Sequence, residues 1–303
     1  MSSPLKKITL VGASGAIGQI LLAALLEASD FDITVLTRSS STASFPASVT
    51  VRKSEFSLTE LRGALAGQDA VISAVGASAF AEQKKLIDAA VAAGVSRFIP
   101  SEFSAESQND TVLALLPLFG QKKEVIDYLK TKEIDISWTG IACSGLFDWG
   151  IANGFLGYDI GSRTATIWDD GNKRFTFTNQ AQLGRALVSV LRHPGATANR
   201  YLYISSVETS QNEILAALEK ATESSWTVQR TTTDAEVSDA TAKLQNGDFS
   251  GAFTLVRATV YGDIPGLGSN YAKDKALANG LLRLEEESVE ETIQRVVSEA
   301  NKQ

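Results

Sequence analysis

A glycine-rich turn near the start of the chain constrains the fold more than any other segment. Residues 8–18 read ITLVGASGAIG, in which an apolar run leads into Gly12, Gly15 and Gly18. The apolar run fits a buried parallel strand, and residues 16–28 fit a helix. Gly12 permits the tight turn, Gly15 lets a pyrophosphate approach the backbone, and Gly18 lets the helix pack closely on the strand. The stretch therefore predicts the strand–turn–helix of a dinucleotide-binding domain, although its spacing departs from strict G-x-G-x-x-G.

The first turn of this predicted helix offers free N–H groups and the positive end of the helix dipole, which together hold phosphate charge. We expect the cofactor phosphates to lie against Ser14, Gly15, Ala16, Ile17 and Gly18.

Apolar strands and helices alternate through the first half of the chain. After the first pair, strands are expected at residues 31–38, 50–52, 69–76, 96–103 and 135–143, and helices at 57–66, 82–93 and about 119–132. Such alternation is typical of right-handed βαβ units that build a parallel sheet covered on both faces. The sequence therefore predicts an α/β fold with a Rossmann-type, doubly wound parallel sheet.

The pattern changes after residue 143. Residues Thr164–Trp168 and 174–178 flank Asp-Asp-Gly-Asn and suggest a β-hairpin, while residues 180–192 and 201–205 suggest a helix and strand that return to the main sheet. The chain beyond residue 210 reads as mainly helical. We expect an NADP-binding domain of residues 1–149 plus about 178–206, and a smaller α+β substrate-binding lobe of residues 150–177 and 207–303.

Composition excludes several classes of function. The chain has 303 residues, is 44% hydrophobic and carries a formal charge of −7, so nothing attracts nucleic acid or an anionic membrane. Its one cysteine, Cys143, and one histidine, His193, leave no internal disulfide and no Cys/His zinc site. We expect a cytoplasmic protein, monomeric or homodimeric, whose partner is a small molecule and which holds no metal.

The end of the second strand indicates which cofactor binds. NAD sites carry an acid at the ligand end of this strand, but Asp32 begins the strand, whereas Thr37, Arg38 and Ser39 end it. A guanidinium with hydroxyls suits a 2′-phosphate, so the sequence favours NADP over NAD. Gly76, which ends the fourth strand, is expected to pass close to the adenine and ribose.

Two lysine motifs compete for the catalytic role. Tyr128 and Lys132 have the Tyr-x-x-x-Lys spacing of short-chain dehydrogenases, but they end a helix whose first turn faces the ligand. Lys132 lies about 15 Å from that first turn at 1.5 Å per residue, so we interpret the spacing as coincidence. Lys122 and Lys123 begin the same helix, where desolvation beside the helix dipole favours acid–base work.

Several segments together resemble the isoflavone reductase and phenylcoumaran benzylic ether reductase family of NmrA-like atypical short-chain dehydrogenases. They are the glycine turn, Arg97-Phe-Ile-Pro-Ser-Glu-Phe103, Lys122-x-x-Val125 and Ser137-Trp-Thr-x-Ile-x-x-Gly-x-Phe147. Two departures stand out: Ser104 replaces the family's usual glycine, and Gly145-Leu-Phe-Asp-Trp149 is similar to fungal members rather than plant enzymes.

The resemblance implies NADPH, hydride transfer to a small aromatic or unsaturated substrate over the ends of the fourth to sixth strands, and a catalytic lysine at Lys122, with Lys123 one residue away. It maps the family's arginine onto Arg38. It adds Ser101, Glu102, Phe103 and Lys122 to the cofactor residues. Phe103, Phe147, Trp149 and Phe155 are candidate walls of the substrate pocket, and the alternative for each of them is a place in the core. The alternatives are an NADP(H)-binding redox sensor without turnover and, less favoured, an epimerase-like enzyme.

Overall fold

The computed structural model describes residues 5–302, which divide into two compact units, each built from separate chain segments. The first holds the described residues up to Phe103 together with Leu118–Ile141 and Leu183–Leu202. The second holds Ser104–Pro117, Ala142–Gln182 and the described residues from Tyr203 onward. The second unit thus also takes a segment directly after the fifth strand, which the sequence analysis left in the dinucleotide domain.

A seven-stranded sheet organises the first unit. Its strand order is β11-β6-β5-β4-β1-β2-β3. The strands are β1 (Lys7–Val11), β2 (Asp32–Arg38), β3 (Thr50–Ser54), β4 (Ala70–Ser73), β5 (Arg97–Ile99), β6 (Ser137–Ala142) and β11 (Arg200–Tyr203). The pairings from β3 through β6 are parallel. β11 also runs parallel to β6, because Asn199 donates to the Trp138 carbonyl and Ile204 to that of Ala142.

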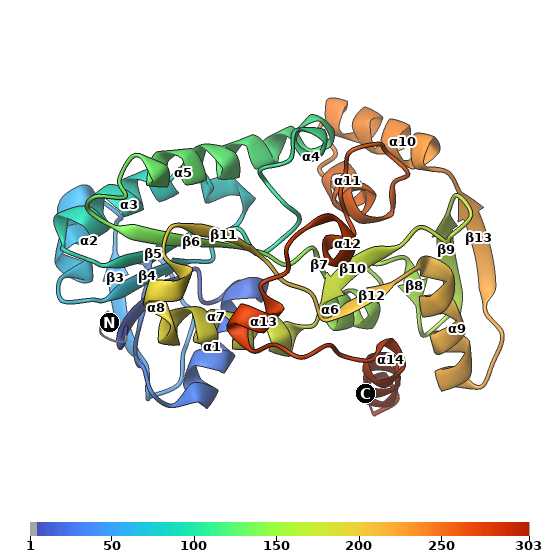
Figure 1. The fold of residues 1–303 in the computed structure, drawn as a ribbon, viewed down its shortest axis with the longest axis horizontal. Coiled ribbons are helices and arrows are strands. Elements are labelled where there is room, and N and C mark those ends of the chain that lie inside the picture. Colours follow the sequence, from blue (N-terminus) through green and yellow to red (C-terminus); the bar gives the residue numbers. More distant parts are fainter. Residues whose placement is uncertain (1–4, 303) are drawn as a thin grey trace. The chain divides into compact units, whose positions relative to one another are not determined.

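Helices cover both faces of this sheet, with α2, α3 and α5 on one face and α1, α7 and α8 on the other (Figure 1). Their bounds are α1 (Ala16–Ala28), α2 (Leu58–Leu65), α3 (Gln83–Ala92), α5 (Gly120–Lys130), α7 (Gln180–Arg192) and α8 (Pro194–Thr197), with 3₁₀ turns η1 (Ala77–Ala79) and η2 (Pro117–Phe119). Leu61 of α2, Ile87 of α3 and Val125 of α5 pack with Val71 and Phe98 of the sheet in one buried core. The strand order and the covered faces confirm the predicted Rossmann-type doubly wound fold.

Short-range interactions set several helix boundaries. The helix after the glycine turn spans Ala16–Ala28, as predicted. Ser57 caps α2 by accepting from the N–H of Glu60. Ser288 likewise caps the last helix by accepting from the N–H of Glu291. In each case the capping hydroxyl satisfies a backbone donor that the helix itself leaves open.

The second unit contains two three-stranded sheets and most of the remaining helices. One sheet has the order β12-β10-β7 and the other β13-β9-β8. The strands are β7 (Gly145–Leu146), β8 (Tyr158–Asp159), β9 (Thr164–Trp168), β10 (Phe175–Thr178), β12 (Val207–Thr209) and β13 (Thr227–Thr231). The helices are α4 (Asp110–Leu115), α6 (Phe147–Ala152), α9 (Gln211–Thr222), α10 (Thr233–Gln245), α11 (Ser250–Tyr261), α12 (Tyr271–Asp274), α13 (Asn279–Leu282) and α14 (Val289–Ala300).

The hairpin predicted around residue 170 is wrong. β9 pairs with β8 and β13, whereas β10 pairs with β7 and β12, so the two expected partners belong to different sheets. Asp169 adopts a left-handed φ of 53°, and its carboxylate accepts from the N–H and hydroxyl of Thr233. The turn residues therefore tie β9 to the start of α10 instead of folding β10 back on β9.

Candidate functional site

The glycine turn between β1 and α1 is closely packed at two of its three glycines. Gly12 has φ +85°, and a Cβ there would lie 2.5 Å from the carbonyl oxygen of Ala74. At Gly18 a Cβ would lie 2.1 Å from the carbonyl oxygen of Gly12, so the helix packs directly on the turn. Gly15 differs, because its Cβ would meet only the Gly12 oxygen at 3.5 Å, an ordinary contact. Its open side is free for a ligand.

A cavity of about 880 Å³ opens beside this turn, at the carboxyl ends of β1, β2 and β4. Six of the predicted cofactor residues line it, namely Gly12, Ser14, Gly15, Thr37, Arg38 and Gly76. Residues not expected from the sequence complete much of the lining, including Ser40, Ser41, Thr42, Phe45, Glu55, Phe56, Glu82 and Gln83. The remaining predicted cofactor residues are not part of this lining: Ala16, Ile17, Gly18, Ser39, Ser101, Glu102, Phe103 and Lys122.

Arg38 ends β2 on the cavity wall, opposite Ser54 of β3. Its side chain is exposed, and Asp32 lies at the other end of the same strand. Beside Arg38, Lys53 donates to the carbonyl of Ser41 at 3.0 Å, which anchors the hydroxyl-bearing loop that follows β2. Of the two acids that line the cavity, Glu55 is the one nearer to Arg38 in the sequence. The donors here fit a phosphate on the adenosine ribose, and the glycine turn leaves room for a pyrophosphate.

Ser101, which follows β5, ties three elements of the sheet edge together. Its hydroxyl donates to the carbonyl of Val75 at 2.8 Å, and its N–H donates to Oε1 of Gln83 at 2.8 Å. Gln83 is 2% exposed and also donates to the carbonyl of Phe80. The sequence analysis did not select Gln83, although its position at the first residue of a helix facing the ligand edge is a signal that could have done so.

Lys122 is buried in the first unit with only 4% of its surface exposed. Its Nζ donates to the carbonyl of Glu102 at 2.9 Å and lies 4.8 Å and 4.6 Å from the ring centroids of Phe80 and Phe119. These rings stabilise a desolvated ammonium through their negative faces. The carboxylate of Glu102 accepts from the hydroxyl of Tyr201 at 2.7 Å, a neighbour that the sequence analysis did not anticipate.

The other basic candidates occupy different surroundings. Lys123 is in an exposed ion pair with Asp127 at 2.9 Å. Tyr128 donates its hydroxyl to Asp88, a hydrogen bond that raises the pKa of the phenol, and Lys132 lies 3.5 Å from the same carboxylate. The structure therefore places the Tyr-x-x-x-Lys spacing at the far end of α5 from Lys122, engaged with α3.

The aromatic residues predicted for a substrate pocket separate into two groups. Phe147 is fully buried in the core of the second unit and stacks on Phe177 with ring centroids 5.7 Å apart. Trp149 and Phe155 are half-buried and pack on each other at 5.4 Å. Phe103, in the first unit, is 5% exposed.

Neither the single cysteine nor the single histidine is among the residues that line the dinucleotide cavity. Cys143 is fully buried after β6, and His193 follows α7 with its Nδ1 2.9 Å from the carbonyl of Ser189. Across residues 5–302, no group of three or more His, Cys, Asp or Glu side chains is arranged to hold a metal. Within the same residues, no helix has both the length and the apolarity to cross a membrane.

Comparisons with known proteins agree with this architecture. Residues 4–245 match the model of the NmrA-like family. Oxidoreductase aprR of Aspergillus flavus is 37% identical over 295 residues, covering 96% of this chain and 98% of its own. Oxidoreductase poxI of Penicillium oxalicum is 34% identical over 300 residues, covering 97% and 95%.

Solved structures give the same fold at lower identity. The binary complex of leucoanthocyanidin reductase from Vitis vinifera with NADPH has a TM-score of 0.77 at 20% identity, over 96% of this chain and 99% of that chain. A structure described as AtPrR2 with NADP⁺ and (+)pinoresinol has a TM-score of 0.80 at 20% identity, over 98% and 100%. The family match spans most of the chain and two relatives exceed 30% identity over nearly its full length, so this chain belongs to the NmrA-like family.

Proposed function

We propose that this chain is an NADPH-dependent oxidoreductase acting on a small aromatic or unsaturated molecule. The observation that carries the proposal is the cavity beside the glycine turn, where Gly15 leaves room for a pyrophosphate and Arg38 stands at the end of β2. The fungal relatives named as oxidoreductases, and the related reductases solved with NADPH or NADP⁺, support the same conclusion.

The residues of the cavity have separable roles in binding. The turn from Gly12 to Gly15 receives the pyrophosphate on backbone N–H groups at the start of α1. Arg38, with the hydroxyls of Thr37 and Ser41, holds the 2′-phosphate by charge-assisted hydrogen bonds. Gly76, where a Cβ would meet nothing within 4 Å, lets the adenine and ribose lie against the backbone. When bound, NADPH supplies the hydride, and the protein supplies position and electrostatics.

Lys122 is the proposed acid–base residue. One of its three ammonium donors is used by the Glu102 carbonyl, and the flanking rings of Phe80 and Phe119 keep water from the group. A lysine held in this way keeps a proton at a fixed atom, Nζ, for transfer to a developing oxyanion or for polarising a substrate oxygen. The carboxylate of Glu102 is itself held by the hydroxyl of Tyr201, which fixes the residue whose carbonyl holds Lys122.

The test begins with cofactor titration. Arg38→Ala is expected to weaken NADPH binding about tenfold to a hundredfold, because one or two charge-assisted hydrogen bonds are lost, while NADH affinity stays within about twofold. Arg62→Ala, in exposed α2 away from the cavity, is the matched control. Equal losses of both cofactors in Arg38→Ala would contradict the 2′-phosphate role.

A turnover assay distinguishes an oxidoreductase from a regulator that binds NADP(H) without catalysis. NADPH oxidation is followed at saturating cofactor against a panel of enones, quinones and aryl ethers. Oxidation with any member supports the proposal. Tight NADPH binding without oxidation of any of them would instead favour an NADP(H)-binding regulator of the same family.

A further inference from the structure

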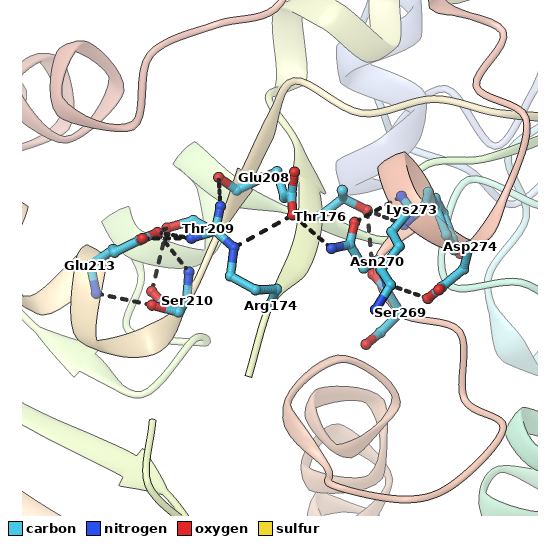
Figure 2. Close-up of polar contacts among 11 residues, drawn as sticks. Arg174, Thr176, Glu208, Thr209, Ser210, Glu213, Ser269, Asn270, Lys273 and Asp274 are labelled. Carbon is cyan, nitrogen blue, oxygen red and sulfur yellow. Dashed lines mark hydrogen bonds and ion pairs between the residues drawn. The ribbon is translucent and has the colours of Figure 1, made fainter. Parts of the chain in front are cut away.

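A second cavity, of about 640 Å³, is lined by residues of the second unit, none of which was assigned a role above. It is bounded by the glycine-rich segment between α11 and α12 and by the start of β10. Four cationic and two acidic side chains contribute to its wall, namely Lys173, Arg174, Lys273, Lys275, Glu208 and Asp274. Figure 2 shows the polar network along this wall.

Two of the four cations are already paired. Arg174 forms ion pairs with Glu213 at 2.5 Å and with Glu208 at 3.4 Å. Lys275 pairs with Glu106 at 2.7 Å. These ion pairs hold the side chains of the wall in place, and they neutralise most of the positive charge that Arg174 and Lys275 could offer a ligand.

The other two cations, Lys173 and Lys273, have no carboxylate at ion-pair distance among residues 5–302. Lys173 is half-buried, and its ammonium donates to the carbonyl of Gly262. Burial lowers the pKa of Lys173, and the nearby Asp263, Asp169 and Asp274 only partly oppose this effect. Lys273 is exposed on the short helix α12. Both ammonium groups therefore have unused hydrogen-bond donors on the same cavity wall.

The acids on the wall are occupied by donors of the protein itself. Glu208 Oε1 accepts from the Asn270 amide at 2.8 Å in addition to Arg174 (Figure 2). Asp274 Oδ2 accepts from the N–H of Asn270 at 3.3 Å. A ligand entering the cavity thus meets acids that are already hydrogen-bonded and lysines that are not paired.

The glycine-rich segment is held rigidly in place. The Asn109 amide donates to the carbonyls of Gly266 and Leu267 at 2.9 Å and 3.3 Å, while the Ser269 carbonyl accepts from the N–H of Thr176 at 3.1 Å. Gly266 and Gly268 both have left-handed φ, of +87° and +58°. No described hydrogen bond uses their N–H groups, and backbone of this kind forms concavities that bind anions.

We propose that this cavity binds a small anionic ligand, whose carboxylate or phosphate group is held by Lys173 and Lys273 against the Gly266–Gly268 backbone. A bound anion gives Lys173, whose ammonium donates to the Gly262 carbonyl, a direct anionic hydrogen-bond partner as well. The proposal concerns the second unit alone and does not depend on the cofactor that the first unit binds.

The experiment is isothermal titration of the full chain without cofactor, using inorganic phosphate and citrate as probes. Saturable binding of at least one probe is expected, and the tighter probe tells whether phosphate or carboxylate is preferred. Lys273→Met is expected to weaken binding about tenfold or more, since a hydrogen bond to a charged group is lost. Lys173→Met should do the same. Because Lys273 is exposed, its variant tests the proposal even if Lys173→Met fails to fold.

Two controls make the result specific. Lys243→Met, the matched control, removes an exposed lysine of α10 that pairs with Asp239, and it should leave probe affinity within about twofold. Arg38→Ala, which removes the phosphate ligand expected in the first unit, shows how much of the probe binding belongs to the dinucleotide cavity. Asp274→Asn should strengthen binding, because it removes a negative charge from the wall.

The opposite pattern overturns the proposal. No saturable binding of either probe, or an affinity in Lys273→Met within about twofold of that of the unmodified chain, excludes this cavity as the anion site. Binding that is lost in Arg38→Ala but kept in Lys273→Met assigns it to the dinucleotide cavity instead.

Discussion

Gly15 and Gly18 are three residues apart but differ in the space around them, so alanine substitutions at the two positions form a matched pair of variants. An alanine Cβ at Gly15 meets no close atom, whereas at Gly18 it lies 2.1 Å from backbone. Gly15→Ala is therefore expected to keep the melting temperature but to weaken NADPH at least tenfold by obstructing the pyrophosphate. Gly18→Ala should cost about 2–3 kcal/mol of stability through overpacking.

Thermal melts and NADPH titrations of both variants check this pair. A Gly15→Ala variant that binds NADPH normally would show that the open side of Gly15 does not receive the cofactor.

The two lysine motifs of α5 give a second residue-scale prediction. Lys122→Ala is expected to lower single-turnover rate by about 10²–10⁴-fold, the usual cost of losing a positioned acid–base group. It should keep NADPH affinity, because the phosphates rest on the glycine turn and Arg38. Tyr128→Phe should change the rate little, since its hydroxyl is engaged with Asp88. The reverse pattern would favour the mechanism of short-chain dehydrogenases that use Tyr-x-x-x-Lys.

Sequence alone could select residues whose role follows from chain position. Arg38 and the glycines lie directly after predicted strands, so their place at the ligand edge followed from strand direction. Gln83 and Tyr201 could not be selected in the same way. Their roles depend on partners, Ser101 and Glu102, that only tertiary packing brings close.

At the scale of elements, Arg97 holds β5 to its neighbours without any carboxylate. Its guanidinium donates to Ser137, Thr139 and Thr197 side chains and to the Pro194 carbonyl, and the residue is 2% exposed. Burial lowers the pKa of Arg97 to about 10, so the group remains charged at neutral pH.

Arg97→Lys is expected to lower the free energy of unfolding by about 3 kcal/mol. The planar guanidinium of arginine reaches all these acceptors at once, whereas the compact ammonium of lysine cannot. Urea denaturation of this variant, compared with Arg62→Lys on the exposed face of α2, measures the difference. A loss of less than about 0.5 kcal/mol, the ordinary effect of a surface substitution, would show that the network contributes little.

The elements predicted best are those encoded locally. The bounds of α1 and the cap of α2 follow from a glycine turn and from Ser57 and Glu60, all within a few residues. Strand pairing in the second unit was predicted worst. β9 finds its partner β13 some sixty residues later in the chain, and no short-range pattern encodes such a pairing. α4 was also missed, because its six residues follow a polar stretch that reads as loop.

At the scale of the whole molecule, cofactor binding should appear as stability. A ligand present at a hundred times its dissociation constant adds about 2.7 kcal/mol, which corresponds to roughly 4 °C in melting temperature for a protein of 303 residues. NADPH should raise the calorimetric transition of the wild-type chain by this amount, and NADH at equal concentration by clearly less. Arg38→Ala should remove the difference. Equal shifts by both cofactors in the wild type would argue against NADPH selectivity.

The position of β11 has a consequence for the order in which the protein is made. β11 pairs with β6, but residues 143–199 lie between them in the chain, and most of these belong to the second unit or lead back from it. While the ribosome synthesises that stretch, β6 has an unpaired edge of backbone donors and acceptors, which is prone to pair with other chains. The dinucleotide-binding sheet, whose earliest strand in the chain is β1, is thus completed only when Arg200–Tyr203 leaves the ribosome.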